Sequence, residues 1–347
     1  MTNKLTRGLS YDDVLLKPQY SDIRSRSDIN ISTNLGHKLN LGLPVIASPM
    51  DTISESRMAS TMNNNGGMAI LHRYNSIEQQ VQLVKGAYRR NTTRPVYGAA
   101  IGISGDYLER AAALVNSGVK VLCVDVAHGH HILMKEALEK LKGLFSSGRI
   151  HIMAGNVATL EGINDLADWG ADSVRCNIGG GSICSTRIQT GHGLPGLQTI
   201  FECAKTDRDV KIIADGGIKN SGDIVKALAA GADAVMVGSL LSGTDEAPGD
   251  VLTGQDGSKW KSYRGMASKE AQMDWRGKYS SFEGVTSRVP YRGPVESILK
   301  DLEKGIRSGF SYSGARTLAE LHSKAEFVVQ TSLGLSESKT HITARSW

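Results

Sequence analysis

One pattern recurs along this chain and constrains its fold more than any other. A helical stretch ends at Gly, two connecting residues follow, and a short apolar strand then begins. Glycine is expected just past a helix C-terminus, because it adopts the left-handed conformation without steric cost. The strands show no strict alternation of apolar and polar residues, which is typical of parallel strands buried on both faces. The clearest copies are 116–124, 169–175 and 230–237.

Other apolar runs and amphipathic stretches alternate with these copies, so that eight β–α steps follow one another. Eight such steps predict a (β/α)8 TIM barrel, with a doubly wound open sheet as the second interpretation. No linker-like stretch divides the chain, so we predict a single catalytic domain over 1–347. The other predicted strands are 44–48, 68–71, 96–101, 150–154 and 211–214, and the predicted helices are 54–64, 77–89, 106–116, 131–144, 160–169, 197–204, 223–230 and 295–307.

Two predicted connections, 177–195 and 239–294, are too long to serve as simple connectors. Loops of this length in a compact domain are usually lids or binding loops, or else disordered. Active sites of (β/α)8 barrels lie at the C-terminal ends of the strands, where both connections begin. We therefore expect both to be active-site loops.

The segment 179–187, Gly-Gly-Gly-Ser-Ile-Cys-Ser-Thr-Arg, is typical of a phosphate site that carries a nucleophile. Its glycines let backbone N–H groups approach an anion, and Ser182 adds a hydroxyl. Cys184 follows as the candidate nucleophile, with a buried structural cysteine as the alternative interpretation.

Other polar residues gather at the predicted strand ends. Gly217 follows strand seven, and Gly238 and Ser239 follow strand eight, where such barrels commonly bind phosphate. Flavin-dependent barrel enzymes share this phosphate site, so it does not define a reaction. The remaining strand-end candidates are Ser48, Asp125, His128, Asn156 and Asp215.

Composition narrows the class of protein. The net charge is only +5 over 347 residues, and no basic block alternates with aromatic residues, so we predict no nucleic-acid partner. No apolar run is long enough to span a membrane, and no N-terminal segment has signal-peptide character. The four cysteines form no C-x-x-C pair, so a zinc site is not expected. These features predict a cytoplasmic protein.

Five motifs in order resemble the inosine-monophosphate dehydrogenase / guanosine-monophosphate reductase family. The resemblance covers nearly the whole chain and implies a (β/α)8 barrel, a homotetramer, and an oxidoreductase that binds GMP or IMP together with a nicotinamide dinucleotide. The motifs are 47–52 (Ala-Ser-Pro-Met-Asp-Thr), 179–187, 214–218 (Ala-Asp-Gly-Gly-Ile), 221–224 (Ser-Gly-Asp-Ile) and 262–266 (Ser-Tyr-Arg-Gly-Met).

Within this family, two features favour the reductase branch, which converts GMP to IMP and ammonia with NADPH. The stretch 90–96 has no room for the CBS modules that most dehydrogenases carry, and Lys278-Tyr279 stands where dehydrogenases have a water-activating Arg-Tyr pair. His128, at a position where reductases usually have Asn, instead favours a dehydrogenase that lacks CBS modules and converts IMP to XMP with NAD. Asn177 and Gly180 also depart from the usual Gly and Pro of the family.

The resemblance implies a role for each candidate residue. Cys184 would bond to purine C2, with Thr186 and Glu283 handling protons at the leaving amine. Carbonyls of Gly179, Gly181 and Cys184 would hold potassium. The implied nucleotide-binding residues are Ser48, Met50, Ser182, Asp215, Gly217, Gly238, Ser239, Tyr263, Gly265 and Met266, and the implied cofactor-binding residues are Asp125, Ala127, His128, Asn156 and Arg175.

The chain has no separate dinucleotide-binding glycine motif, so the cofactor is expected to share the barrel mouth with the nucleotide. A catalytically silent nucleotide-binding protein remains a further interpretation of the same residues.

Overall fold

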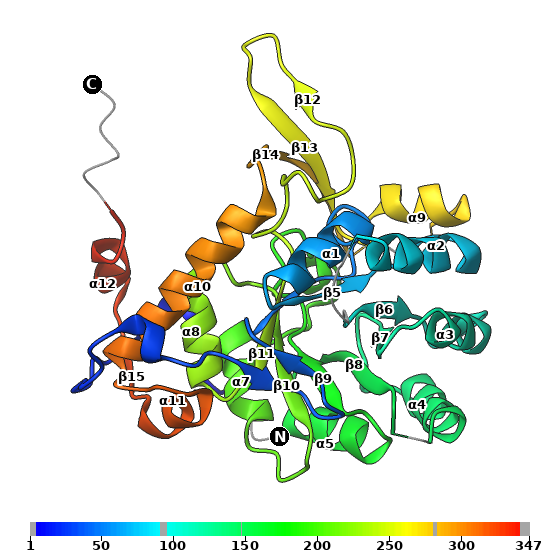
Figure 1. The fold of residues 1–347 in the computed structure, drawn as a ribbon. Helices are drawn as coiled ribbons and strands as arrows, with labels where there is room; N and C mark the ends of the chain where they lie inside the picture. Colours follow the sequence, from blue (N-terminus) through cyan, green and yellow to red (C-terminus); the bar gives the residue numbers. More distant parts are fainter. Residues whose placement is uncertain (1–4, 91–95, 147, 280–282, 341–347) are drawn as a thin grey trace.

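Eight parallel strands form a closed barrel, with helices around the outside, in the computed structural model of the chain (Figure 1). The structure describes residues 5–90, 96–146, 148–279 and 283–340. The strand order is β10-β11-β4-β5-β6-β7-β8-β9, which confirms the predicted (β/α)8 barrel. The strands are β4 (Val45–Ala47), β5 (Met68–Leu71), β6 (Gly98–Ile101), β7 (Val121–Asp125), β8 (His151–Val157), β9 (Ser173–Cys176), β10 (Lys211–Asp215) and β11 (Ala234–Val237).

The helices of the outer layer begin and end within a few residues of their predicted bounds. Local capping fixes several starts: the Ser76 and Thr159 hydroxyls accept hydrogen bonds from backbone N–H groups of the first turn. One helix extends beyond its predicted end because Phe310 continues its buried face. The helices are α1 (Ser56–Asn64), α2 (Ile77–Tyr88), α3 (Tyr107–Asn116), α4 (Ile132–Leu144), α5 (Leu160–Asp168), α7 (Gly196–Cys203), α8 (Ser221–Ala229) and α10 (Val295–Tyr312).

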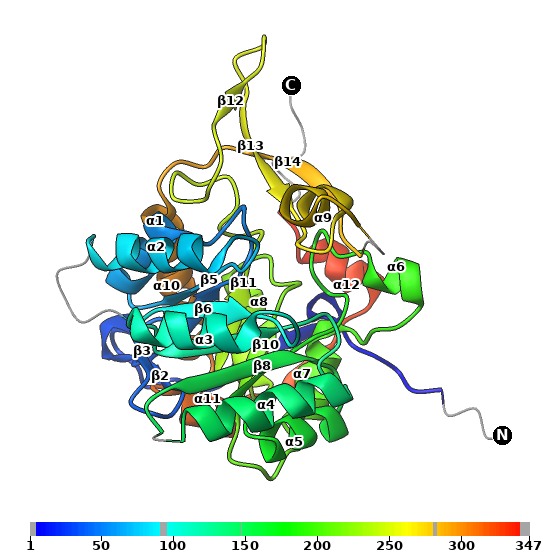
Figure 2. The ribbon, with the colours of Figure 1, turned by 90° about the vertical axis from the view of Figure 1, so that its right-hand side faces the viewer.

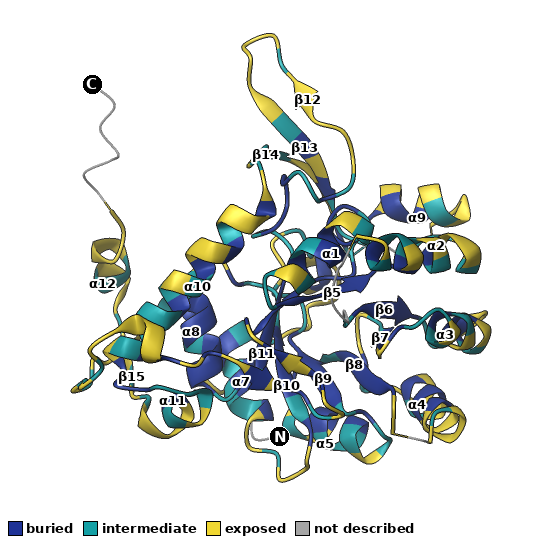
Figure 3. Ribbon diagram, viewed as in Figure 1, coloured by how far each residue is buried: buried dark blue, intermediate teal, exposed yellow. Residues whose placement is uncertain are grey.

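Side chains of the barrel strands divide between two apolar cores, and both faces of the strands are buried (Figure 3). In β4, for example, Val45 and Ala47 pack in the layer between strands and helices, whereas Ile46 packs inside the barrel. This alternation follows from the period of two in a strand. The interior set is Ile46, Met68, Ile70, Ala100, Val121, Cys123, Met153, Ile213, Ala234 and Met236.

A short hairpin of β2 (Thr33–Asn34) and β3 (Asn40–Leu41) closes the N-terminal end of the barrel. Its residues Leu35, Leu39 and Leu41 are buried in the same cluster as the barrel interior. The lower barrel is therefore packed solid, which leaves the C-terminal end of the strands as the place for a ligand.

The predicted active-site loops contain secondary structure of their own. The antiparallel sheet of β12 (Leu252–Thr253), β13 (Lys259–Arg264) and β14 (Thr286–Pro290) projects from the barrel (Figures 1 and 2). α9 (Lys269–Arg276) lies between β13 and β14 in the chain, and α6 (Thr186–Thr190) lies in the other loop. The pairing of β13 with β14 spans the α9 segment, so no local sequence pattern indicated it.

Segments near the two ends of the chain pair in a way that the sequence did not suggest. β1 (Val14–Leu16) pairs antiparallel with β15 (Phe327–Val329), and the Gln330 N–H donates to the Asp13 carbonyl. The other short elements are η1 (Tyr11–Asp13), η2 (Arg26–Asp28), α11 (Leu318–Lys324) and α12 (Ser332–Glu337). None of the helices in the described ranges is long and apolar enough to cross a membrane.

We expect Phe310→Ala to lower the free energy of unfolding by about 3–5 kcal/mol, since it removes a fully buried ring from α10 and leaves a cavity. The matched control is Tyr312→Ala on the same helix, because Tyr312 is 62% exposed. Its expected effect is within about 0.5 kcal/mol. Urea unfolding of the two variants makes the comparison, and equal losses would contradict the packing described for α10.

Burial at the N-terminal end of the barrel lowers the pKa of His151 from 6.5 to about 4. Its ring is 1% exposed and pairs with the Ser173 hydroxyl at 2.7 Å. The folded state thus binds this proton less readily than the unfolded chain, so stability is complete above pH 6.5 and falls toward pH 4. The expected loss is about 3 kcal/mol.

We expect His151→Gln to flatten this acid-induced fall in the free energy of unfolding, measured across the same pH range. The exposed His322→Gln is the control and should keep the parent slope. A His151→Gln slope equal to that of the parent would show that another group causes the acid sensitivity.

Candidate active site

A cavity lies at the C-terminal ends of the barrel strands, and its walls come from most of the strand-end segments. Every candidate residue from the sequence lines this cavity except His128. His128 is exposed beside it, and burial of its ring, followed by repulsion from neighbouring histidines, lowers its pKa. The strand ends and the family resemblance together thus supplied residues that share one cavity, with His128 outside its wall.

Cys184 begins a short chain of hydrogen bonds. Its Sγ donates to Thr186 Oγ1 at 3.1 Å, and Thr186 Oγ1 donates to Glu283 Oε2 at 2.7 Å. Thiol, hydroxyl and carboxylate therefore form a continuous path along which a proton can move from sulfur to carboxylate. We refer to these three residues as the thiol relay.

Backbone pairing holds the two halves of the thiol relay together. The Ser185 N–H donates to the Glu283 carbonyl at 2.8 Å, and the Val285 N–H donates to the Ile183 carbonyl at 3.0 Å. Cys184 and Gly284 form an isolated antiparallel bridge between these bonds. Glu283 is therefore positioned by main-chain hydrogen bonds, although nearly a hundred residues separate it from Cys184.

Three charged residues form the top layer of the barrel interior. Arg175 of β9 lies between Asp125 of β7, at 2.5 Å, and Asp215 of β10, at 2.8 Å. Asn156 Nδ2 also donates to Asp215, at 2.8 Å. The donors from Arg175 and Asn156 all reach Oδ2 of Asp215, so its orientation is strongly restrained.

The charges of this layer reinforce one another. Burial alone would lower the pKa of Arg175, but the two carboxylates raise it above its ordinary value, with Asp215 the stronger influence. Arg175 therefore stays charged, and its paired geometry is the kind that can offset the cost of burying ions.

Neighbouring atoms leave no room for a side chain at Gly217 or Gly238, two glycines of the cavity wall. A Cβ at Gly238 would lie 2.9 Å from the Tyr263 hydroxyl and 3.1 Å from Met50 Sδ. Gly217 has a φ of +74°, and a Cβ there would meet the Gly180 carbonyl at 3.0 Å. Only glycine leaves room here for an anion to approach backbone N–H groups. Burial raises the pKa of Tyr263, which keeps its phenol protonated as a donor.

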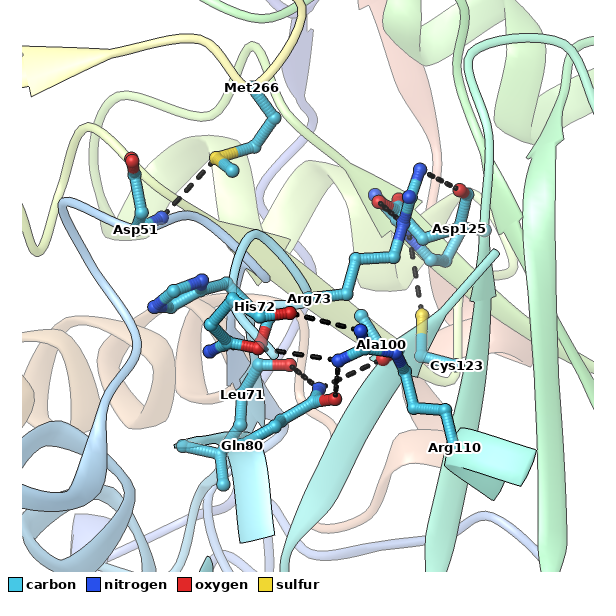
Figure 4. A network of polar contacts seen from close by, with 12 residues as sticks. Asp51, Leu71, His72, Arg73, Gln80, Ala100, Arg110, Cys123, Asp125 and Met266 are labelled. Atoms are coloured by element: carbon cyan, nitrogen blue, oxygen red, sulfur yellow. Dashed lines mark hydrogen bonds and ion pairs between the residues drawn. The ribbon is translucent and has the colours of Figure 1, made fainter. Parts of the chain in front are cut away.

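Two cavity residues with charged or aromatic side chains were missed by the sequence analysis. Arg73 and Tyr74 follow β5 directly, and both line the cavity. The Arg73 guanidinium donates to the Asp125 carbonyl at 3.1 Å (Figure 4). Their position just after a barrel strand was the signal that could have identified them.

A buried polar network holds the loop that carries Arg73 and Tyr74 (Figure 4). Arg110 of α3, 3% exposed, donates to the Asn75 carbonyl at 2.9 Å and to Gln80 Oε1 at 2.8 Å. Gln80 Nε2 donates in turn to the Ala100 carbonyl at 2.9 Å. The network ties the β5–α2 loop to β6 and α3, so this wall of the cavity is rigidly supported.

The long loop after β11 reaches this wall through α9. Trp275 of α9 stacks on Tyr74 with ring centroids 4.2 Å apart, and the Arg276 guanidinium lies 4.0 Å from the Trp275 ring centre. Lys278 and Tyr279 are both exposed and lie outside the cavity wall. The Tyr279 ring instead faces the ammonium of Lys269, at 4.8 Å.

A sequence model described as "IMP dehydrogenase / GMP reductase domain" matches residues 8–341. The inosine-5'-monophosphate dehydrogenase of Nitrosopumilus maritimus (strain SCM1) is 33% identical over 469 residues, covering 96% of this chain and 98% of that protein. The GMP reductase of Leishmania major is 34% identical over 479 residues, covering 97% of each chain.

Both alignments are longer than this 347-residue chain, so both relatives contain residues that this chain lacks. The extra length occurs in a relative of each name. The missing insertion, which we took to favour a reductase, therefore does not separate the two activities.

Among solved structures, a Cys-to-Ala variant of the GMP reductase of Trypanosoma brucei, in complex with guanosine 5'-monophosphate, is closely similar to this fold. The TM-score is 0.92 at 32% sequence identity, covering 97% of this chain and 98% of that one.

We expect Arg175→Met to lower the free energy of unfolding by about 3–5 kcal/mol, because Asp215 loses its guanidinium partner and Asp125 keeps the longer contact with Arg73, at 3.8 Å. Arg208→Met is the matched control. Arg208 also contacts two aspartates, Asp168 and Asp207, but its side chain is 40% exposed, so the expected loss is below about 1 kcal/mol. Urea unfolding measures both, and similar losses would contradict a structural role for the buried triad.

Proposed function

Because this chain belongs to the family of IMP dehydrogenases and GMP reductases, we propose that it is a GMP reductase. The reaction converts GMP, NADPH and a proton to IMP, ammonia and NADP. Family members are oxidoreductases that act on purine nucleotides with a nicotinamide dinucleotide. The reductive direction and the choice of NADPH are our own assignment.

The observation that carries this proposal is the thiol relay. The Cys184 proton passes to Thr186, whose own proton passes to Glu283 along the 3.1 Å and 2.7 Å contacts. The thiolate then bonds to purine C2 as the electron pair of the C2=N3 double bond moves to N3, and that pair re-forms the double bond when the amine leaves. Glu283 returns the proton to the 2-amino group, and the C2–N bond breaks with release of ammonia.

When bound, the nicotinamide dinucleotide would supply a hydride to purine C2. As the new C–H bond forms, the Cys184–C2 bond breaks, its electron pair returns to sulfur, and IMP leaves. The thiol relay then needs one proton to return to its starting state, which balances the reaction.

Absence of a water-activating pair at the cavity supports a reductase over a dehydrogenase. A dehydrogenase must hydrolyse the same covalent adduct, whereas a reductase must keep water away from it. The chain has Lys278-Tyr279 where dehydrogenases of this family have Arg-Tyr, and within the described part of the chain neither residue reaches the cavity.

The nucleotide is assigned to the glycine-rich wall. Asp215, restrained by Arg175 and Asn156, would accept hydrogen bonds from the ribose hydroxyls. Tyr263 and backbone N–H groups near Gly217 and Gly238 would hold the phosphate. The other assigned contacts are Ser48, Met50, Ser182, Ser239, Gly265 and Met266.

The dinucleotide is assigned to the part of the cavity beside Asp125, Ala127 and Asn156. We add Arg73 and Tyr74 to these residues, because both line the cavity. Arg175 acts here by orienting Asp125 and Asp215, since its guanidinium contacts both carboxylates. NADPH as the donor remains a proposal.

A potassium ion would be held by the carbonyls of Gly179, Gly181 and Cys184. The Gly181 carbonyl also accepts the Cys184 N–H at 3.1 Å, which leaves one of its lone pairs for a cation. The homotetramer implied by the resemblance likewise remains a prediction.

IMP dehydrogenase is the second candidate, because a relative of that name is as similar as the relative named GMP reductase. It predicts oxidation of IMP to XMP with NAD and no turnover of GMP.

We test the assignment by following the absorbance of the reduced nicotinamide with the purified full-length chain, in both directions. GMP should consume NADPH and release ammonia. Cys184→Ala should abolish turnover, and Glu283→Gln should lower kcat by about 10²–10⁴-fold, since it removes the proton-transfer group.

Two variants control for these changes. Cys203→Ala removes a buried thiol on α7 outside the cavity wall, and Glu270→Gln neutralises an exposed carboxylate of α9. Both should retain near-parent kcat. Reduction of NAD by IMP, with no reaction of GMP, would replace the proposal by the dehydrogenase.

A further inference from the structure

Asn177 carries a buried amide and lies at the base of the loop that holds Cys184. The proposed mechanism gives it no role. It follows β9 directly and is 3% exposed. Its Nδ2 donates to the Asp215 carbonyl at 2.8 Å and reaches the Gly216 carbonyl at 3.4 Å. The first residue of the thiol loop is thus tied to the turn that ends β10.

The Asn177 side chain occupies the space that a side chain at Gly180 would need. A Cβ at Gly180 would lie 2.2 Å from Asn177 Nδ2, 2.7 Å from Oδ1 and 2.8 Å from Cγ. Real Cβ atoms do not approach so closely, so Asn177 would have to move and give up its bonds to the β10 turn. The position of the Asn177 side chain therefore depends on the absence of a side chain at Gly180.

This arrangement sets the thiol loop against the nucleotide turn. A Cβ at Gly216 would lie 3.4 Å from Gly181 Cα, and one at Gly217 would lie 3.0 Å from the Gly180 carbonyl. The backbone of 180–181 thus rests on that of 216–217. Gly181 then begins the turn that holds Cys184, because its carbonyl accepts the Cys184 N–H at 3.1 Å.

A second amide reinforces the connection. Asn156 Nδ2 donates both to the Asn177 carbonyl at 2.9 Å and to Asp215 Oδ2 at 2.8 Å. Main chain and side chain of Asn177 are therefore both linked to Asp215, the residue assigned to the ribose.

We propose that Asn177 is a positioning residue that holds the Cys184 thiol in the correct position relative to the bound nucleotide. It does so only in combination with Gly180. The inference rests on the proposed function only in taking a purine nucleotide as the ligand. The proposed mechanism assigns neither residue to a reacting atom; Asn177 acts through the backbone carbonyls of Asp215 and Gly216.

The test compares Asn177→Gly, Gly180→Ala and the double variant with the parent chain. The main readout is the rate at which iodoacetamide modifies Cys184, followed by mass spectrometry of the Cys184 peptide, with and without saturating GMP or IMP. If bound nucleotide slows the modification, the Cys184 thiol lies next to the nucleotide in the folded protein. This measurement does not depend on turnover. The thermal midpoint, kcat and KM complete the comparison.

We expect Gly180→Ala to lower kcat and nucleotide protection of the thiol by about tenfold or more, because small displacements of a reacting group carry costs of this size. Asn177→Gly should lower kcat by about tenfold with a smaller change in KM, because the phosphate wall stays in place. The double variant should have about the same kcat as Asn177→Gly alone, so that the two losses do not add, since the obstructing amide is gone.

Gly143→Ala is the control, because nothing lies within 4 Å of a Cβ at that helical glycine. If Gly180→Ala fails to fold, recovery of folded protein in the double variant replaces the kinetic comparison. Losses that simply add in the double variant, or a double variant that also fails to fold, would overturn the coupling. Failure of GMP turnover with the coupling intact would count against the proposed reaction and not against this inference.

Discussion

The buried contact of Arg175 with Asp125 and Asp215 is the interaction on which the upper half of this barrel depends. Below it, the inward side chains of the strands are apolar and fill the barrel. At the last inward-facing position of β7, β9 and β10, the side chains are charged. They are stable there only because they pair with one another. This layer ends the core and begins the site, because it orients the carboxylate assigned to the ribose and supports the base of the cavity.

The geometry of the thiol relay above this layer is made largely by backbone contacts. The thiol loop rests on the glycines that end β10, with Asn177 beneath it. Main-chain hydrogen bonds pair the same loop with the segment that carries Glu283. Because glycine backbones can approach one another closely, segments from three distant parts of the chain meet within hydrogen-bond distance. The relay of thiol, hydroxyl and carboxylate is a consequence of that close approach.

Prediction from sequence succeeded where the governing physics is local. The helix that ends at Gly170 and the strand that begins at Ser173 are encoded by neighbouring residues, and so are the N-caps of α2 and α5. The rule that sites lie at strand ends then selected Cys184, Asp215 and Gly238, and all three line the cavity. It would also have found Arg73 and Tyr74, had the residues after β5 been considered. Pairing of β1 with β15 and of β13 with β14 was missed, because each joins strands whose partner is encoded far away or beyond an intervening helix.

The sequence by itself determined the order of the strands and helices and the barrel they form, since periodicity and capping act over a few positions. The strand-end rule and the family resemblance together supplied the candidate residues, all of which except His128 line one cavity. Only the tertiary structure decided which of those residues touch. It placed Glu283 beside Thr186, left His128 outside the cavity wall, and brought Trp275 onto Tyr74. It also showed that Arg175 contacts two carboxylates inside the barrel. These contacts depend on how closely distant backbones approach, and that distance is set by the packing of the whole barrel and by no single segment.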